Sequence, residues 1–129
     1  MIQVLLVDDD PVIRMLVDHG LGMITSNQYQ VTYESRCHDA LVHVNRQAFD
    51  LILLDNRLSK TVTAKATVPL FRRSRFKSPI AIISSDISED YLSNPSILGV
   101  DYIVDKKNLM QFLKDQVALS ELLSTKEAI

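Results

Sequence analysis

The segment Leu51–Asp55 has the sequence LILLD, in which four apolar residues are followed by a carboxylate. Two other segments repeat this pattern, because Val4–Val7 precedes Asp8 and Ile80–Ile83 precedes Ser84. Short apolar runs that do not alternate with polar residues are typical of strands buried on both faces of a parallel sheet. The three segments therefore predict the central strands of such a sheet.

Strand and helix patterns alternate along the rest of the chain. Tyr29–Tyr33 and Tyr102–Val104 are predicted as further strands, whereas helical patterns cover Pro11–His19 and His38–Gln47 and begin again at Asn108. Such alternation requires crossover connections between parallel strands. The chain is therefore predicted to have an α/β fold, with a doubly wound parallel sheet of five strands and helices on both faces.

Prolines and glycines predict where the helices begin and end. Gly20 suits the C-terminal cap of the first helix. Pro69 would cost about 3 kcal/mol inside a helix, so the third helix is expected to begin near Thr67 and to leave Ser59–Ala66 as a long loop. Pro95 predicts the start of a short or broken fourth helix. The last helix is expected to carry an apolar stripe of Leu109, Phe112, Leu113 and Val117, extended by Leu119, Leu122 and Leu123.

The composition is that of one globular domain. The chain has 129 residues, 47% of them hydrophobic, which is enough for one sizeable core. The 14 basic and 16 acidic residues nearly balance, so no overall field would attract nucleic acid or an acidic membrane. Cys37 is the single cysteine, and no segment has the features of a secretory signal or a membrane span. We therefore expect one cytoplasmic domain over residues 1–129, without an output domain.

Polar residues at the ends of the predicted strands are expected to converge at one edge of the sheet. These residues are Asp8 and Asp9, Asp55, Ser84 and Lys106. Three neighbouring carboxylates repel one another unless a cation neutralises them, and Mg²⁺ prefers oxygen ligands and pairs with phosphate. The lysine and the hydroxyl would complete a cradle for a transferring phosphoryl group, with Asp55 as the nucleophile.

These residues, in this order, resemble those of the response-regulator receiver family of two-component signalling. The matching features are the acidic pair within Val7-Asp8-Asp9-Asp10-Pro11, Asp55 after its apolar run, Ser84 after Ile82-Ile83, and Lys106 placed 22 residues after Ser84. The resemblance implies a flavodoxin-like strand order of 2-1-3-4-5. It also implies a magnesium site of Asp8, Asp9, Asp55 and the backbone carbonyl of Arg57, phosphorylation of Asp55, and contacts of Ser84 and Lys106 with the phosphoryl group.

The same resemblance implies the partners of the domain. The phosphodonor would be a sensor histidine kinase or a histidine phosphotransfer protein, and a downstream protein would bind the phosphorylated form. Such a domain is not an enzyme beyond its own phosphorylation and dephosphorylation. Arg57 and Asp86 would lie close enough to the aspartyl phosphate to tune its lifetime. The sequence predicts a monomer or a weak homodimer, because exposed leucines after residue 117 would support association.

Some residues depart from the family pattern. Ser59 and Lys107 replace prolines, and Ile103 stands where the family often has a switching aromatic residue. Tyr102 is expected on the opposite face of the same strand. The bond between Lys106 and Lys107 is expected to be trans, because a cis bond without proline costs about 3–4 kcal/mol. These departures cast doubt on the usual switching mechanism.

Two other functions remain open at this point. The motif Asp8-Asp9-Asp10-Pro11-Val12 also fits a haloacid-dehalogenase-like phosphatase with Asp8 as nucleophile, although Asp55 would then have no role. A phosphorylation-independent pseudo-receiver would keep the fold as an interaction module, and Lys107 and Ile103 favour that interpretation. Other motifs indicate structure only: His19, His38 and His43 do not form a zinc pattern, and Gly20-Leu21-Gly22 follows a helix instead of a strand.

Overall fold

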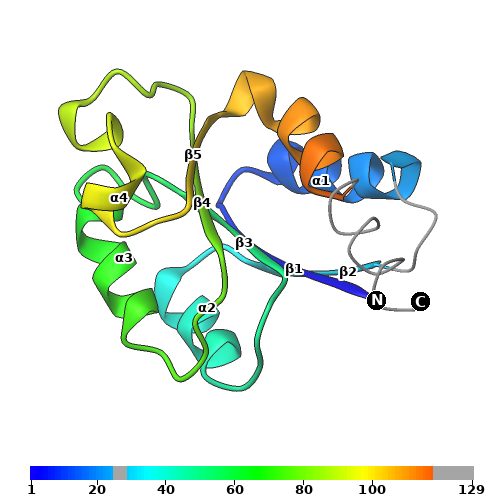
Figure 1. Cartoon of the computed structure of the whole chain (residues 1–129), viewed down its shortest axis with the longest axis horizontal. Coiled ribbons are helices and arrows are strands. Elements are labelled where there is room, and N and C mark those ends of the chain that lie inside the picture. The colour runs from blue at the N-terminus through cyan, green and yellow to red at the C-terminus, as the bar shows by residue number, and fades with distance from the viewer. Residues whose placement is uncertain (25–28, 118–129) are drawn as a thin grey trace.

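Five parallel strands form one sheet in the computed structural model, which describes residues 1–24 and 29–117. The strands are β1 (Ile2–Val7), β2 (Tyr29–Glu34), β3 (Leu51–Asp55), β4 (Ile80–Ser84) and β5 (Tyr102–Asp105). Their order is β2-β1-β3-β4-β5, and every neighbouring pair is parallel (Figure 1). The predicted fold class and strand order are therefore confirmed.

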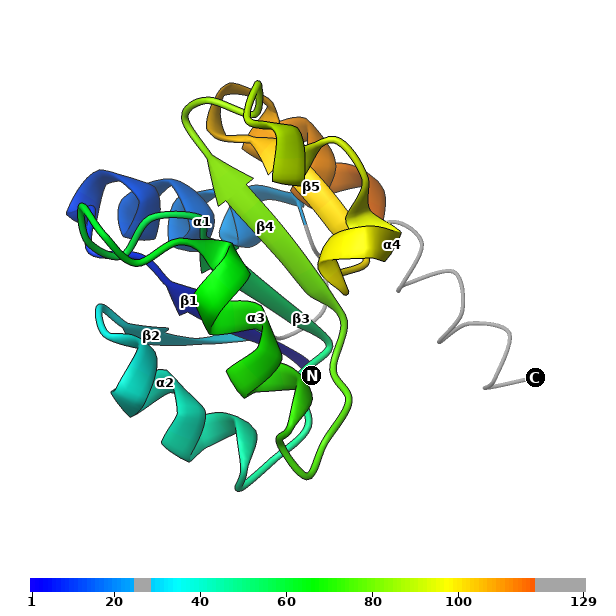
Figure 2. The same ribbon diagram turned by 90° about the vertical axis from the view of Figure 1, so that its left-hand side faces the viewer.

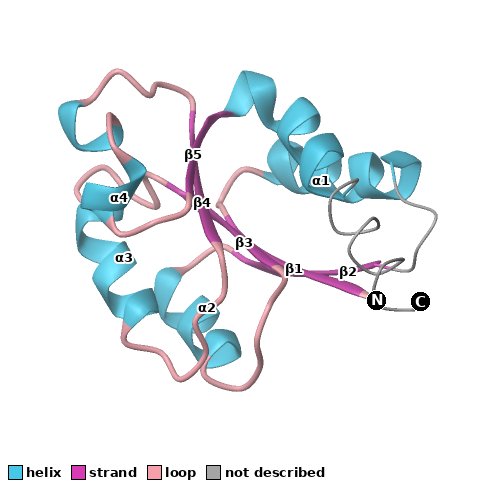
Figure 3. Ribbon diagram, in the orientation of Figure 1, coloured by secondary structure: helices cyan, strands magenta, loops and turns pink. Residues whose placement is uncertain are grey.

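Helices cover both faces of the sheet. They are α1 (Pro11–Ile24), α2 (Cys37–Val44), α3 (Ala64–Arg72), α4 (Pro95–Leu98) and the helical residues 109–117, with short 3₁₀ turns η1 (Asp90–Leu92) and η2 (Lys106–Asn108). Figure 3 shows α1 and residues 109–117 on one face and α2, α3 and α4 on the other. No helix within residues 1–24 and 29–117 is long and apolar enough to cross a membrane.

Two hydrophobic cores lie on the two faces of the sheet. One contains Leu6, Leu21, Leu53 and Leu113 between the sheet, α1 and residues 109–117, and the other contains Leu5, Leu54 and Phe71 under α2 and α3. All five residues of β3 and all five of β4 are buried. This double burial explains why the central strands have continuous apolar runs.

The expected end of α1 at Gly20 is wrong, because the helix continues to Ile24. Gly20 is buried where α1 meets residues 109–117, and a Cβ atom there would lie 2.3 Å from the Met110 side chain. Glycine inside a helix costs roughly 1 kcal/mol relative to alanine. The close helix contact and the buried Val17 and Leu21 offset that cost, so the glycine serves packing and not termination.

The expected start of the third helix near Thr67 is also wrong. Helix α3 begins at Ala64, whose N–H donates to the side-chain oxygen of buried Asn56 at 3.2 Å. Pro69 lies inside α3, on the exposed side of the helix together with Lys65, where water can satisfy the carbonyl that loses its partner. A tertiary hydrogen bond thus starts the helix earlier than its sequence indicates, and the loop beside Asp55 is shorter than expected.

The remaining helices are close to expectation. The fourth helix is short, as predicted: α4 has four residues, and Asn94 accepts a hydrogen bond from the Ser96 N–H at 3.0 Å. The last α-helix begins at residue 109, directly after Asn108 as predicted, and it follows the 3₁₀ turn η2, which is capped by Asp105. No cis peptide bond occurs in the described residues, so the Lys106–Lys107 bond is trans as expected. The predicted extension of the apolar stripe to Leu119, Leu122 and Leu123 lies outside the described residues.

Candidate functional site

The carboxyl ends of the strands meet at one edge of the sheet, since all five strands are parallel (Figure 2). Asp55 and Ser84 are the last residues of β3 and β4, and the chain leaves β1 and β5 at Asp8 and Lys106. Strand pairing places Asp55 beside Ile83 and Ser84 beside Asp105. The fold therefore brings the predicted site residues to one edge, as the strand-end pattern required.

Asp8 is the buried anchor of this site. Its side chain is fully buried, and its Oδ1 accepts a hydrogen bond from the Asp10 N–H at 2.8 Å. Its Oδ2 lies 3.0 Å from the Lys106 ammonium but has no well-directed hydrogen bond. Asp10 has a different role, because its Oδ1 accepts from the Val12 N–H at the start of α1. A buried carboxylate oxygen without a hydrogen bond is a good position for a cation ligand.

Asp55 lies next to this anchor. Its Oδ1 accepts a hydrogen bond from the Arg57 N–H at 3.3 Å and lies 3.5 Å from the Lys106 ammonium. Burial and the Asp8 carboxylate raise the pKa of Asp55 from 3.8 to about 7, although Lys106 and the Arg57 N–H act in the opposite direction. One lysine therefore does not neutralise the site.

Asp8, Asp9 and Asp55 each place a carboxylate oxygen within 4.8 Å of the others. Asp9 is exposed, whereas Asp8 and Asp55 are buried, so the group opens to solvent on the Asp9 side. Hard divalent cations prefer such oxygen ligands, and Mg²⁺ usually keeps water in the remaining positions. The three side chains thus fit a magnesium ion in both chemistry and spacing. The carbonyl of Arg57 as a fourth ligand stays a prediction.

Lys106 and Lys107 differ in position. The Lys106 side chain is mostly buried and contacts both Asp8 and Asp55, whereas Lys107 is 77% exposed and lies 3.7 Å from Asp105. Burial opposes the charge on Lys106, but the Asp8 and Asp55 carboxylates raise its pKa above the ordinary value. Lys106 is therefore the lysine at the site, the one selected from the spacing.

Ser84 lies at the site, but its hydroxyl is held within its own loop. The hydroxyl donates to the Asp86 carbonyl at 2.8 Å and accepts from the Asp86 N–H at 3.3 Å. A contact with a phosphoryl group on Asp55 would require the hydroxyl to leave the Asp86 carbonyl. The Asp86 side chain is exposed, and its hydrogen bonds with Ser88 lower its pKa.

Two contacts that the sequence did not predict hold the segment after Asp55. The Asn56 side-chain oxygen accepts a hydrogen bond from the Tyr91 hydroxyl at 2.9 Å, and the Arg57 guanidinium forms an ion pair with Glu89. We call these two contacts the loop clamp. No local pattern points to Tyr91 or Glu89, which lie more than 30 residues away in the sequence. A polar Asn56 directly after an apolar strand was the only available signal.

The two faces of β5 differ as expected. Tyr102 packs edge to face against Phe112 with ring centroids 5.1 Å apart, on the α1 side of the sheet. Ile103 packs into the core on the opposite side, against the group that includes Leu92 of η1 and Val100. An aromatic side chain is thus absent from position 103, on the face of β5 toward α4.

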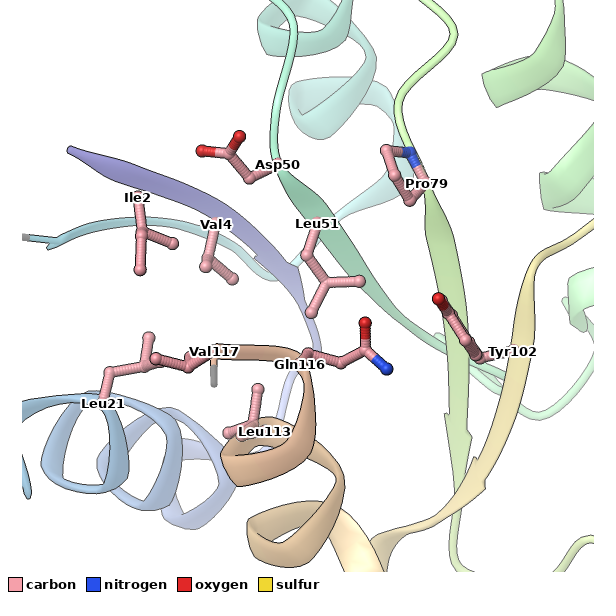
Figure 4. A pocket seen from close by; sticks show the side chains of 10 residues that line it. All are labelled: Ile2, Val4, Leu21, Asp50, Leu51, Pro79, Tyr102, Leu113, Gln116 and Val117. Atoms are coloured by element: carbon pink, nitrogen blue, oxygen red, sulfur yellow. The ribbon is translucent and has the colours of Figure 1, made fainter. Parts of the chain in front are cut away.

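A cavity of about 180 Å³ lies at the other edge of the sheet (Figure 4). Its walls come from the first residues of strands, including Ile2 and Leu51, and from Leu21 and Leu113 of the covering helices. None of the carboxylates at the opposite edge lines this cavity. The candidate chemistry therefore belongs to the carboxyl edge of the sheet and not to this cavity at the opposite edge.

Comparison with known proteins assigns the chain to a family. The model of the response regulator receiver domain matches residues 4–118. The chain belongs to the response regulator receiver family. This receiver domain is thus a member of the phospho-accepting signalling modules of two-component systems. No curated protein sequence matches the chain.

Solved structures of other receiver proteins share the fold of this chain. The receiver domain of the sensor histidine kinase PA1611 from Pseudomonas aeruginosa, with magnesium in its active site cleft, is 21% identical, with a TM-score of 0.69 over 90% of this chain and 97% of that one. The phosphorylated cyanobacterial phytochrome response regulator RcpA is 21% identical, with a TM-score of 0.67 over 88% and 89%. A CheY-like receiver from Methanospirillum hungatei is 17% identical, with a TM-score of 0.69 over 94% and 97%.

Proposed function

We propose that this receiver domain accepts a phosphoryl group on Asp55 in a magnesium-dependent reaction and signals through protein–protein contacts. The observation that carries the proposal is the grouping of three carboxylates within 4.8 Å of one another beside the Lys106 ammonium. Asp55 is the acceptor in this proposal because its side chain is 8% exposed, whereas that of Asp8 is 0% exposed. The same difference weakens the phosphatase alternative with Asp8 as nucleophile.

The proposed reaction forms a bond between an Asp55 oxygen and phosphorus while the bond from phosphorus to the donor breaks. Asp55 must be ionised to attack, and its raised pKa shows that neutralisation by Lys106 alone is incomplete. Asp8, Asp9, Asp55 and the Arg57 carbonyl would hold the magnesium ion. The ion would supply the missing positive charge and bind phosphoryl oxygens. The magnesium in the related PA1611 domain supports this part of the proposal.

Lys106 and Ser84 have distinct proposed roles once the phosphoryl group is attached. Lys106 would transfer part of its contact from the carboxylates to a phosphoryl oxygen, since its ammonium already lies 3.5 Å from Asp55 Oδ1. Ser84 would donate its hydroxyl to another phosphoryl oxygen after releasing the Asp86 carbonyl. Both contacts would stabilise the aspartyl phosphate.

An exposed apolar stripe on α1 supports the proposed class of donor. Val12, Met15, Leu16 and Met23 are all exposed and recur at helical spacing from the turn after Asp9 onward. A helical surface of a sensor histidine kinase or histidine phosphotransfer protein could pack on this stripe and present its phosphohistidine to Asp55. Exposed apolar groups at such a position favour protein binding over binding of a small soluble donor.

The test is to incubate the protein with Mg²⁺ and acetyl phosphate and to locate the bound phosphoryl group by peptide mass. We expect one acid-stable, base-labile label on Asp55 that disappears in Asp55→Asn. Asp39→Asn, a change to an exposed aspartate on α2, is the matched control and should be labelled normally. A label on Asp8 would support the phosphatase alternative. If the protein takes up no label and binds no magnesium, the phosphorylation-independent interaction module is the remaining function.

A further inference from the structure

The loop clamp connects the two residues after Asp55 to the η1 turn. Asn56 is 1% exposed, and its N–H donates to the Ile83 carbonyl at 2.9 Å, so its backbone is fixed against β4. Its side-chain oxygen accepts from both Ala64 N–H and the Tyr91 hydroxyl. In this part of the clamp, one buried oxygen joins the start of α3 to Tyr91 of η1.

The second part of the clamp is exposed and exchangeable. The Arg57 N–H contacts Asp55, but its guanidinium is paired with Glu89, and these side chains are 47% and 31% exposed. The ion pair raises the pKa of Arg57 and lowers that of Glu89. Solvent screening makes such a pair easy to break when a stronger partner is available.

A phosphoryl group on Asp55 would be such a partner for Arg57. It carries a charge of about −1.5 to −2 at pH 7, compared with −1 for Glu89, and guanidinium groups bind phosphate oxygens in a bidentate manner. The Arg57 N–H already donates to the Asp55 carboxylate at 3.3 Å, so the exchange would require a change in the side-chain rotamer of Arg57. When the guanidinium leaves, Glu89 loses its positive partner. The negative charge of Asp86, which already acts to raise the pKa of Glu89, then repels it.

We propose that Arg57 exchanges Glu89 for the phosphoryl group on Asp55, and that this exchange loosens residues 86–92. The inference rests on the proposed phosphorylation of Asp55. The exchange needs no aromatic residue in β5, which agrees with isoleucine at position 103. Tyr91 stays bound to Asn56, so the change is a partial release of the turn that precedes α4. The downstream partner would then recognise the released Glu89 and its neighbours.

Hydrogen exchange of residues 86–92, measured with and without Mg²⁺ and acetyl phosphate, tests this proposal. The label on Asp55 is measured by mass on the same samples. In the unchanged protein we expect exchange in this segment to become about three- to ten-fold faster on phosphorylation. In Glu89→Gln the segment should exchange faster before phosphorylation, and phosphorylation should add little. Asp90→Asn changes the neighbouring exposed charge and should respond like the unchanged protein.

Two further variants separate the role of Arg57 from a general effect on folding. Arg57→Ala keeps its backbone carbonyl and loses only the guanidinium, so at an equal extent of label on Asp55 it should show no phosphorylation-dependent change in residues 86–92. Tyr91→Phe should exchange faster in both states and keep the response, because its ion pair is intact. Two results would overturn only the proposed switch of Arg57 from Glu89 to the phosphoryl group. One is label on Asp55 without faster hydrogen exchange in residues 86–92, and the other is an unchanged response in Arg57→Ala. Absence of label in the unchanged protein would overturn the proposed function and this inference together.

Discussion

At the residue scale, the buried Asp55 carboxylate lowers the free energy of unfolding once it is ionised. Its carboxylate is buried beside Asp8, and its pKa is raised to about 7. The folded protein therefore binds a proton at Asp55 more tightly than the unfolded chain does. The contribution of this group to stability is fully present below about pH 4 and is lost as pH rises through about 7.

Asp55→Asn should remove this pH dependence in the absence of divalent cations. We expect the variant to be more stable than the unchanged protein by about 2 kcal/mol at pH 8, with a smaller difference at pH 5. Urea unfolding in EDTA at several pH values measures the effect. Parallel stability curves for the two proteins across this range would show that the Asp55 carboxyl does not have the raised pKa.

The contribution of Asn56 to the free energy of unfolding can be measured one hydrogen bond at a time. Tyr91→Phe removes one of the two hydrogen bonds to the Asn56 oxygen and should cost about 1 kcal/mol. Asn56→Ala removes both and leaves the buried Ala64 N–H without a partner, so about 3 kcal/mol is expected. Equilibrium unfolding of both variants checks the order. Equal losses would mean that the hydrogen bond to Ala64 contributes nothing to the start of α3.

At the scale of whole elements, two helices pack closely side by side. Helix α1 and residues 109–117 approach so closely at Gly20 that a Cβ atom would meet Met110, and this contact explains the glycine inside a helix. The obstructing atoms are the Sδ and Cε at the far end of a flexible side chain. The cost of a larger residue at position 20 should therefore depend on what occupies position 110.

A double-mutant cycle tests this dependence. Gly20→Ala should destabilise the unchanged protein by about 1 kcal/mol, because displacement of Met110 outweighs the gain in helix propensity. In a Met110→Ala background the same change should stabilise the protein by roughly 0.5–1 kcal/mol, since the space is free. Thermal or urea unfolding of the four proteins gives the coupling. The same effect of Gly20→Ala in both backgrounds would exclude the contact as the reason for the glycine.

At the scale of the whole molecule, the sheet could be predicted because each central strand carries its own signal. Leu51–Asp55 is buried along its full length, so its apolar run is visible without knowledge of its neighbours. Parallel pairing then brings Asp8, Asp55 and Lys106 to one edge. Helix limits depend instead on distant partners, such as Met110 for Gly20 and Asn56 for Ala64. The loop clamp was missed for the same reason.

The charge at the carboxyl edge gives a last prediction for the whole molecule. Three carboxylates and one ammonium leave a formal charge of −2 there when all are ionised, so a bound cation should stabilise the folded state. At ten times its dissociation constant, Mg²⁺ should add about 1.4 kcal/mol, or roughly 4 °C in Tm. Asp9→Asn, at the exposed ligand, should lose most of this shift, whereas Asp39→Asn should keep it.

The magnesium effect should also depend on pH, because protons and the cation compete for Asp55. With a pKa of about 7 for Asp55, the increase in Tm should be larger at pH 8 than at pH 6. Thermal unfolding at fixed Mg²⁺ concentration and two pH values measures this difference. A full shift in Asp9→Asn, or a larger shift at pH 6, would place the stabilising cation somewhere other than the three carboxylates. A larger increase in Tm at pH 8, lost in Asp9→Asn, would show that magnesium binding and protonation of Asp55 both control the stability of the fold. The proposed signalling depends on the same three carboxylates.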